Sequence, residues 1–544
     1  MSEYLPAREL WPTRIYTLPE FAVYPDRFNP TEELLDKQVE AGRGDRTAVL
    51  FEDQRMTYGQ LLTQANKLGS ALRELGVKEG NPVILRTPNI PPALVANFAI
   101  LKLGAVYTPT SPLLSRTEIA HVANDSEAVA IIVSAALMAE LEAARENLET
   151  VRHIIVVGGE PAEIKAKGYI PYSELLQAGA ATLDPVRRKR DDVAILLYTS
   201  GTTGPPKGTV HFVEETLIVP DTFGKYGWKI RQDDVIGGTA PLAFGAGYST
   251  YATIPFRFGA AASLTAKFEP EKMFEIIQRH HITVLTLAPT AYRKMLQVPD
   301  AERKYDLSSL RLCTGGGESL TAPTLYEWEE KFGMKIYEGL GTTEMMYVFA
   351  SNAVKQEAMP GSFGQAVPGY ELRVVDEDGN DVPPGTIGLF IVRGPTGTVY
   401  WRDEQKQRDA VTPDGWNRAG DFVYADEHGY YWFVSREDDI IKSSGYRIGP
   451  EEIEITLASH PAVLDVGVIG VPEEVRGQIA KAFVVVKPGE KVTSDELIEY
   501  CRDKIATYKL PREVVMVNDL PRTPTGKLLR RVLRQKETEV RRAA

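Results

Sequence analysis

The sequence predicts an α/β protein with a large N-terminal domain, built of two parallel-type sheets with flanking helices and a β-rich subdomain, and a small, mobile α+β C-terminal domain. Three observations support this prediction. The chain has 544 residues, of which 43% are hydrophobic, so it is too long for a single core. Strand-like and helix-like segments alternate through its first part. After Tyr370 the pattern changes to short alternating segments separated by tight turns.

The elements of the first part follow from the spacing of apolar residues. After Thr57, leucines and alanines recur at helical spacing from Leu61 to Leu75, and Gly76 supplies a C-terminal stop. Strands and helices then alternate as they do in a largely parallel sheet. The segments expected next are a strand at 82–86, a helix at 92–103, and strands at Val106, 129–133 and 153–157.

The later elements are delimited by turn residues. In the β-rich subdomain, strands are expected at 372–375 and 389–392, on either side of the Asp378-Gly379 and Pro383-Pro384-Gly385 turns. The last unit is expected to contain a helix at 450–458, strands at 463–469 and 481–486, and a helix from Ser494. We therefore predict two domains, 1–437 and 438–544.

Charge and cysteine content exclude several classes of protein. The net charge of −12 disfavours binding to nucleic acid and to anionic membranes, so an anionic ligand has to be held by local positive groups. Cys313 and Cys501 are the only cysteines and are far apart in the sequence, which excludes a disulfide framework and a cysteine-rich metal site. The N-terminus lacks the apolar core of a signal peptide, and we expect a cytoplasmic protein.

One uncharged stretch, 235–256, is long enough to cross a bilayer. It contains four glycines, two prolines and several threonines and tyrosines. Because glycine and proline break helices, we expect buried strands and turns in this stretch and no membrane span.

A loop rich in glycine and hydroxyl residues follows the apolar segment 193–198. Main-chain amides can turn inward at its glycines, its hydroxyls add donors, and Lys207 supplies a full positive charge, as in a site for a polyphosphate. The position of the lysine does not fit the Walker pattern, and the strand-like segments on both sides disfavour a flexible linker. The candidate phosphate-binding residues are Thr199, Ser200, Gly201, Thr202, Thr203, Gly204 and Lys207.

A second motif runs from Tyr337 to Glu344, after an expected strand at Lys335. Glu344 offers the oxygen ligands that Mg²⁺ prefers, and Mg²⁺ commonly arrives with a nucleotide. Three further segments follow in order: Arg418-Ala419-Gly420-Asp421, then the stretch from Ser435 to Arg447 (SREDDIIKSSGYR), then Pro521-Arg522-Thr523-Pro524-Thr525-Gly526-Lys527.

Together these five segments resemble the motifs of the adenylate-forming enzymes, which include acyl-CoA synthetases, luciferases and peptide-synthetase adenylation domains. The resemblance covers nearly the whole chain and implies ATP, Mg²⁺ and coenzyme A as ligands. It implies that the loop 199–207 wraps the β- and γ-phosphates, with Thr343 near the α-phosphate and Glu344 on Mg²⁺. Asp421, for which a turn aspartate is the alternative, then binds the ribose hydroxyls with help from Arg436. The further nucleotide-binding residues that it implies are Gly317, Glu318, Ser319, Gly339, Leu340, Gly341 and Thr342.

The resemblance also implies roles in a smaller, rotating domain. Lys527 matches the lysine that reaches the acyl carboxylate and the α-phosphate, where an ammonium relieves the repulsion between two anions; a solvated lysine in a basic tail is the alternative. Asp438 matches the hinge residue. Gly445 matches the glycine that lets the pantetheine thiol of CoA pass to the adenylate. The resemblance places Arg447, which follows it, near the phosphate side of that passage.

The acyl pocket implied by the resemblance comprises Phe244, Gly247, Gly315, Gly316, Leu340, Gly341 and Met345. The stretch 241–248 has no aspartate to meet an α-ammonium, which argues against an amino acid as substrate. Segments 5–12, 240–244 and 286–293 are most similar to benzoate and 2-aminobenzoate CoA ligases. This similarity implies a flat aryl carboxylate beside Phe244.

The sequence therefore predicts an ATP- and CoA-dependent carboxylate ligase that acts on a small-molecule acid, as a monomer or homodimer. Three alternatives stay open: a medium- or short-chain fatty acyl-CoA synthetase, an adenylating enzyme that loads a carrier protein, and a catalytically silent nucleotide-binding protein. Intact Lys207, Glu344, Asp421 and Lys527 argue against the last.

Overall fold

The computed structural model describes residues 2–199, 205–318, 320–443, 446–473, 475–502, 504–522 and 528–543. The chain forms two compact units. The first comprises Met1–Pro360, Gly364–Glu371 and Arg393–Asn417, and the second comprises Gly361–Phe363, Leu372–Val392 and Arg418–Ala544. The 437/438 domain boundary expected from the sequence falls inside the second unit and stays a prediction.

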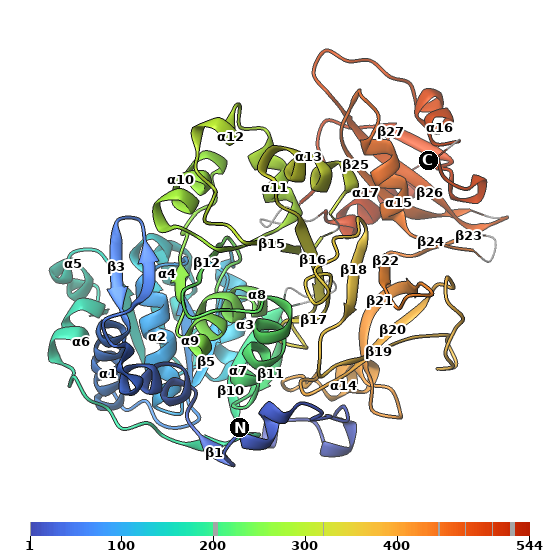
Figure 1. Cartoon of the computed structure of the whole chain (residues 1–544). Helices are drawn as coiled ribbons and strands as arrows, with labels where there is room; N and C mark the ends of the chain where they lie inside the picture. The colour runs from blue at the N-terminus through green and yellow to red at the C-terminus, as the bar shows by residue number, and fades with distance from the viewer. Residues whose placement is uncertain are drawn as a thin grey trace. The chain divides into compact units, whose positions relative to one another are not determined.

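The first sheet of the first unit has seven strands. Three of them, β5, β10 and β11, are labelled in Figure 1. All neighbours in it are parallel except the first two, which run antiparallel. In sheet order the strands are β11 (Lys207–Phe212), β10 (Val193–Thr199), β5 (Val106–Pro109), β4 (Pro82–Arg86), β6 (Ala130–Ser134), β7 (His153–Val157) and β8 (Ile170–Pro171). The strands expected at 82–86, Val106, 129–133, 153–157 and 193–198 are all present, within one or two residues at their ends.

The second sheet of the first unit is parallel in its centre and antiparallel at both ends. In sheet order its strands are β17 (Val348–Ser351), β16 (Ile336–Gly341), β15 (Leu312–Gly316), β14 (Val284–Leu287), β12 (Val235–Gly238), β13 (Ala261–Ser263), β2 (Thr47–Phe51) and β3 (Gln54–Thr57). At one edge, Gln365 and Ala366 of β18 (Ser362–Ala366) pair with β17. Two parallel-type sheets in the large N-terminal part are therefore confirmed.

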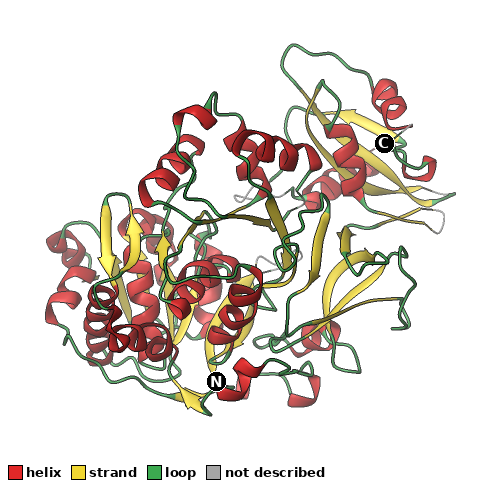
Figure 2. Ribbon diagram, in the orientation of Figure 1, coloured by secondary structure: helices red, strands yellow, loops and turns green. Residues whose placement is uncertain are grey.

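Helices flank both sheets of the first unit (Figure 2). The helix expected after Thr57 is α1, which Thr57 caps in a reciprocal arrangement with Gln60. The α-helices are α1 (Tyr58–Glu74), α2 (Pro91–Lys102), α3 (Arg116–Ser126), α4 (Met138–Ala144), α5 (Pro161–Ala166), α6 (Tyr172–Ala178), α7 (Glu215–Val219), α8 (Gly245–Tyr248), α9 (Ile254–Phe258), α10 (Pro270–His280), α11 (Pro289–Leu296), α12 (Ala301–Lys304), α13 (Ala322–Phe332) and α14 (Glu404–Ala410).

The stretch 235–256 is only partly as expected. β12 and a turn occupy its first half, but its second half is helical, from α8 through the π-helical turn Ser249–Thr253 to α9. Tyr248 and Tyr251 are fully buried there, so tertiary packing has overridden the strand preference of tyrosine and threonine. Within the described part of the chain, no helix is long and apolar enough to cross a membrane.

The second unit contains two sheets. One has the strand order β19 (Glu371–Val375), β20 (Gly388–Arg393), β21 (Asn417–Ala425), β22 (Tyr431–Arg436). The other comprises β24 (Tyr446–Ile448), β23 (Ile441–Ser443), β26 (Gly477–Val486) and β25 (Val463–Glu473), with β27 (Glu513–Met516) paired to β26. Its helices are α15 (Pro450–Ala458), α16 (Ser494–Arg502) and α17 (Arg530–Ala543). The expected small α+β domain is thus confirmed.

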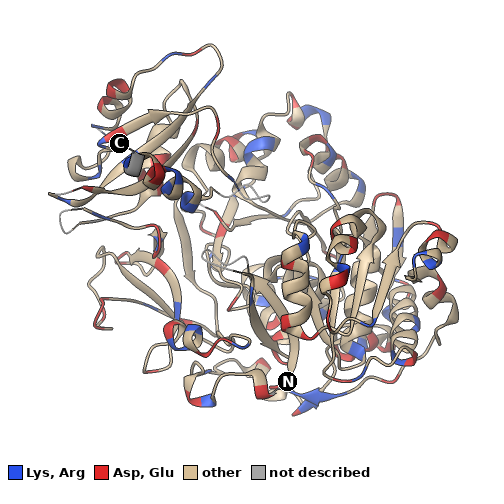
Figure 3. Cartoon of the chain, turned by 180° about the vertical axis from the view of Figure 1, so that it is seen from behind, with Lys and Arg blue, Asp and Glu red and all other residues tan. Residues whose placement is uncertain are grey.

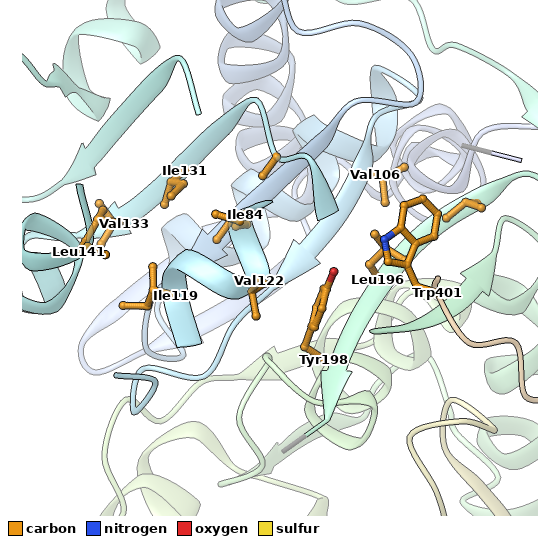
Figure 4. Packing of buried hydrophobic residues seen from close by; sticks show 14 of the residues in the cluster. Ile84, Val106, Ile119, Val122, Ile131, Val133, Leu141, Leu196, Tyr198 and Trp401 are labelled. Atoms are coloured by element: carbon orange, nitrogen blue, oxygen red, sulfur yellow. The ribbon is translucent and has the colours of Figure 1, made fainter. Parts of the chain in front are cut away.

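Acidic and basic residues alternate along the helices and strands of the ribbon rather than being separated by sign (Figure 3). The net charge of −12 is therefore spread over many elements. Each unit has its own apolar core. In the first unit, one core cluster covers one face of the first sheet at β4, β5, β6 and β10 and includes Leu196, Tyr198 and Trp401 (Figure 4).

Candidate active site

The ends of the candidate phosphate loop are held by adjacent strands of the first unit. β10 ends at Thr199 and β11 begins at Lys207, and these two residues are cross-strand partners. The residues on either side are buried in the first sheet. The two ends of the loop are therefore fixed side by side, which a flexible linker does not require. Several predicted residues lie outside the described residues: Ser200, Gly201, Thr202, Thr203, Gly204, Ser319, Gly445 and Lys527.

The ammonium of Lys207 is paired with a carboxylate. Lys207 Nζ donates to Asp403 Oδ2 at 2.6 Å. The other oxygen, Asp403 Oδ1, accepts from the backbone amide of Lys406 at 3.0 Å, so Asp403 caps α14. Burial opposes ionisation of Asp403, but the hydrogen bonds from Lys207 and from the Lys406 amide outweigh it and lower the pKa of this carboxyl below its ordinary value.

The second motif is divided between a strand and a turn. Expected to follow a strand, it instead supplies most of β16, because residues 337–341 pair with β15 or β17 on either side. Thr342, Thr343 and Glu344 then form a half-buried turn, in which the Met346 amide donates to Thr343 O at 3.0 Å. Glu344 Oε1 accepts from the hydroxyl of Tyr400 at 2.9 Å.

Glu344 suits an ion that arrives with a nucleotide better than a resident metal ion. Among the described residues, no group of three or more His, Cys, Asp or Glu side chains could form a metal site. Mg²⁺ is commonly held by one or two carboxylates together with substrate phosphates, and a single half-buried carboxylate fits that arrangement.

The glycines of the predicted pocket allow close backbone approach. Gly316 of β15 pairs with Gly339 of β16, and a Cβ on Gly316 would lie 2.9 Å from Gly339 O. A Cβ on Gly341 would lie 2.2 Å from Tyr347 O. Side chains at these two positions would therefore push the strands apart. Gly315 has no such restriction, since its nearest neighbour is an ordinary 3.5 Å contact.

Three predicted stretches meet at the N-terminus of α8. Phe244 precedes α8 and is half-buried. A Cβ on the next residue, Gly245, would lie 2.2 Å from Met346 O and 3.6 Å from Leu197 Cδ1. The first unit thus brings together the end of β10, the start of α8 and the turn after β16. Within α8, a Cβ on Gly247 would lie 2.0 Å from Pro241 O, which keeps the 241–247 turn tight.

Other residues predicted for the nucleotide have structural partners. Glu318 Oε1 accepts from the Thr290 amide at 2.7 Å and from its hydroxyl, and Glu318 forms an ion pair with Arg293 at 3.4 Å. Glu318 therefore satisfies the N-terminus of α11. Gly317 has a φ of 87°, a left-handed conformation that favours glycine. Leu340 lies on β16 and Met345 is buried.

The two predicted ribose residues are neighbours in the second unit. Asp421 of β21 and Arg436 of β22 are cross-strand partners, and Arg436 Nη1 donates to Asp421 Oδ1 at 2.7 Å. The carboxylate is fully buried, whereas 53% of the Arg436 side chain is exposed. The guanidinium thus offsets the cost of burying this charge and extends towards solvent.

The predicted hinge lies in a turn of the second unit. Asp438 is exposed, and the amides of Asp439 and Ile440 both donate to Arg436 O. The neighbouring Asp439 carboxylate is bound by Arg530 and Arg534, both from α17. Arg447 belongs to β24, where it pairs with Lys442.

Tyr400 and Asp403 contact predicted site residues but were not predicted from the sequence. The run Tyr400-Trp401-Arg402-Asp403 has one usable local signal, because Asp403 before a helical segment is a typical N-cap. That signal predicts α14 and nothing about Lys207, which is 196 positions away.

Known protein families and individual proteins match this chain over most of its length. A family model described as AMP-binding enzyme matches residues 35–401, and one described as AMP-binding enzyme C-terminal domain matches residues 452–527. The chain is 33% identical to a benzoate–CoA ligase of Thauera aromatica, over 94% of this chain and 96% of the relative. It is 32% identical to an acetyl-coenzyme A synthetase of Bacillus subtilis, over 93% of this chain and 90% of the relative.

Solved structures agree in fold. The crystal structure of an anthranilate CoA ligase in complex with anthranoyl-AMP superposes with a TM-score of 0.89. The two sequences are 34% identical, over 96% of this chain and 99% of that chain.

Proposed function

We propose, on the premise that this chain belongs to the AMP-binding enzyme family and is an AMP-forming acid–thiol ligase, that its acid substrate is a flat aryl carboxylate of the benzoate or 2-aminobenzoate type. ATP and coenzyme A are the substrates of the acyl-CoA ligases of this family. The one finer point is therefore the acid.

One observation supports an aryl acid: a benzoate–CoA ligase and an anthranilate CoA ligase are both about one-third identical to this chain over almost all of it. The geometry is compatible, because Phe244 is half-buried and directly precedes Gly245, whose backbone lies against Met346 O. A ring beside a flat ligand gains about 0.5–1.5 kcal/mol beyond burial.

In the proposed reaction, the acid attacks ATP to give an acyl-AMP and pyrophosphate. The CoA thiolate then displaces AMP to give the thioester. Thr199, Lys207 and the loop between them would bind the β- and γ-phosphates, with Thr343 beside the α-phosphate. Asp421 and Arg436 would bind the ribose hydroxyls, for which a buried carboxylate is a well-placed acceptor.

The remaining roles concern charge and movement. Mg²⁺ at Glu344 would neutralise part of the charge on the polyphosphate. Lys527 would hold the acid carboxylate near the α-phosphate during the first step. Asp438 would be the hinge between the two half-reactions, and Gly445 and Arg447 would serve the CoA side.

An aliphatic acid is the second candidate, and the similarity to an acetyl-coenzyme A synthetase over 93% of this chain favours it. A single change in a pocket alters discrimination by about 1–3 kcal/mol, so relatives that share most residues can differ in their acids. A carrier protein in place of CoA as the acyl acceptor is a further candidate.

The test is AMP release by the purified protein with ATP, CoA and a panel of acids: benzoate, 2-aminobenzoate, acetate, hexanoate and octanoate. We expect kcat/KM to be highest for an aryl acid, by at least about tenfold, or about 1.4 kcal/mol. A preference for acetate or octanoate would refute the aryl assignment. Release of ADP would refute the reaction, and adenylate formation without any CoA-dependent turnover would indicate a carrier protein.

A further inference from the structure

The segment 398–403 lies along β11, the strand that Lys207 begins. The Val210 amide donates to Val399 O at 2.8 Å, and the Trp401 amide donates to Gly208 O at 2.9 Å. Between these bonds, Thr209 and Tyr400 form an antiparallel bridge. The backbone of the segment is thus held at the edge of the first sheet, next to the end of the phosphate loop.

The side chains of this segment anchor it in the core of the first unit. Val399, Tyr400 and Trp401 are each at most 4% exposed. Trp401 lies close to Leu196 in the cluster shown in Figure 4, and its indole Nε1 donates to Asp125 O at 2.9 Å. A Cβ on Gly208 would already lie 3.0 Å from Trp401 Cβ. The segment therefore has little room to shift.

The helix that follows the segment fixes it from the other side. Gln407 of α14 is fully buried. Its amide oxygen accepts from the Tyr400 amide at 2.9 Å, and its amide nitrogen donates to Thr398 O at 2.9 Å. A buried side chain that satisfies the backbone in both directions holds these residues in one register.

Two polar groups leave this rigid segment, and each contacts a residue predicted for the polyphosphate. Tyr400 donates to Glu344, and Asp403 accepts from Lys207. A lysine side chain loses about 2 kcal/mol of rotamer entropy when it is fixed, and a contact formed before the ligand arrives reduces what binding must still supply. An ammonium has three donors, so one bond to Asp403 leaves two for phosphate oxygens.

We propose that Asp403 and Tyr400 are positioning residues of the ATP site: Asp403 orients the Lys207 ammonium, and Tyr400 orients the Glu344 carboxylate. The inference rests on the proposed function of Lys207 and Glu344, and not on the identity of the acid. Neither residue touches the reacting atoms, so each acts through the side chain that it holds.

The main test is Asp403→Asn, measured as MgATP affinity by isothermal titration without acid or CoA, and as KM and kcat for ATP in the full reaction. Asparagine caps helices as well as aspartate does, so α14 keeps its N-cap while the charge facing Lys207 is lost. We expect the ATP dissociation constant and KM to rise about tenfold, with kcat within about twofold.

A double-mutant cycle separates positioning from a general structural effect. If Asp403 acts through Lys207, Asp403→Asn has no further effect on ATP affinity in a Lys207→Met background. Additive losses would overturn the proposal. Tighter ATP binding by Asp403→Asn would also overturn it, because Asp403 would then compete with phosphate for the lysine.

A matched control lies on the same segment. Arg402, the residue before Asp403, forms an ion pair with Glu127 at 2.5 Å. Glu127→Gln removes that pair and is expected to leave ATP affinity unchanged. An equal loss of affinity in Glu127→Gln and Asp403→Asn would assign the effect to the fold of the segment and refute the role of Asp403.

The Tyr400 arm is tested in the same way. Tyr400→Phe keeps the ring in the core and removes the hydroxyl that donates to Glu344. We expect MgATP affinity to fall about fivefold, with no further loss in a Glu344→Gln background. Additive losses in this cycle would refute the role of Tyr400. ATP binding is read without any acid, so these outcomes are independent of the substrate panel: an incorrect aryl assignment leaves both cycles unchanged.

Discussion

The segment 398–403 of the first unit and helix α17 of the second show two ways of holding a chain segment next to predicted site residues. The first is fixed by burial, with Val399 fully buried and Trp401 3% exposed. α17 follows the predicted catalytic Lys527, and among its described side chains Leu533 and Glu537 are the buried ones. Leu533 packs against Ile469 and Phe483.

Ion pairs make most of the other contacts that attach α17 to its unit. Arg530 pairs with Asp439 at 3.2 Å and with Glu454 at 2.7 Å, and Arg534 also binds Asp439. Further along the helix, Glu537 binds Lys481. Buried apolar surface carries no charge for salt to screen, whereas salt screens ion pairs with a partner about one-third exposed, as in Arg534–Asp439 (33% for Arg534) and Arg541–Glu513 (37% for Arg541). We therefore predict that the stability of segment 398–403 does not depend on salt, whereas the attachment of α17 weakens when salt is added.

The largest expected effect is on the buried segment. Trp401→Ala should lower the free energy of unfolding by about 3–5 kcal/mol, through lost transfer energy and the cavity left in the core. Chemical denaturation at low and high salt should give the same difference. Leu113→Ala, at a residue 60% exposed in the same unit, is the control and should change stability by less than about 0.5 kcal/mol. A loss that depends strongly on salt would break the comparison.

The next effect is on catalysis and concerns Lys527. Lys527→Ala should slow adenylation, read by exchange of pyrophosphate into ATP, about 10²- to 10³-fold, because an ammonium aimed at developing charge is lost. Thioester formation from supplied acyl-AMP should be largely retained. Lys487→Ala, at an exposed lysine of the same unit, is the control. Equal losses in both half-reactions would contradict a role confined to the first.

A smaller effect is expected from the ion pairs of α17. Arg530→Ala should lower the free energy for local opening of α17 by about 2–3 kcal/mol, below the value for a fully buried pair because Asp439 and Glu454 remain partly exposed. Hydrogen exchange of the α17 amides measures this, and added salt should reduce the difference between the variant and the original chain. Lys536→Ala, at an exposed position of α17, should have little effect. If the two variants behave alike, apolar packing of Leu533 rather than charge holds the helix.

The sequence predicts well where periodicity is local. The helix after Thr57, the strand at 82–86 and the helix at 450–458 lie where apolar spacing and stop signals place them. The stretch 245–256 was missed because its tyrosines and threonines favour strands in isolation, whereas in the fold they are buried in a helix.

The site shows the same limit. Motif order assigned Thr199 and Lys207 to the phosphate loop, and Asp421 and Arg436 to the ribose. Each of these pairs consists of cross-strand partners in the structure. The contacts from Asp403 and Tyr400 join residues 196 and 56 positions apart. Only the packing of β11 against segment 398–403 brings them together, and no local pattern records it.

The smallest effect follows from pH and concerns Glu537 of α17. Burial raises its pKa, but the hydrogen bonds from Lys481 and Arg541 outweigh burial, so the pKa of this carboxyl is lowered in the folded chain. A depressed pKa gives stability that is present above the unfolded value, about 4.3, and is lost as pH falls through the folded value. The attachment of α17 should therefore weaken below about pH 4, by about 0.5–1 kcal/mol, because Arg541 is partly exposed and solvent screens the pair.

Protection factors of the α17 amides between pH 6 and pH 3 measure this loss. Glu537→Gln should show the lower protection already at pH 6 and a smaller further loss in acid than the original chain, the remaining loss coming from Asp439 and Glu454, which also pair with α17. The Val210 amide, which is bonded to Val399 O in the buried segment, is the internal reference and should keep its protection over the same range. If Val210 and α17 lose protection together, acid acts on the whole chain, and burial and charge do not hold the two segments differently.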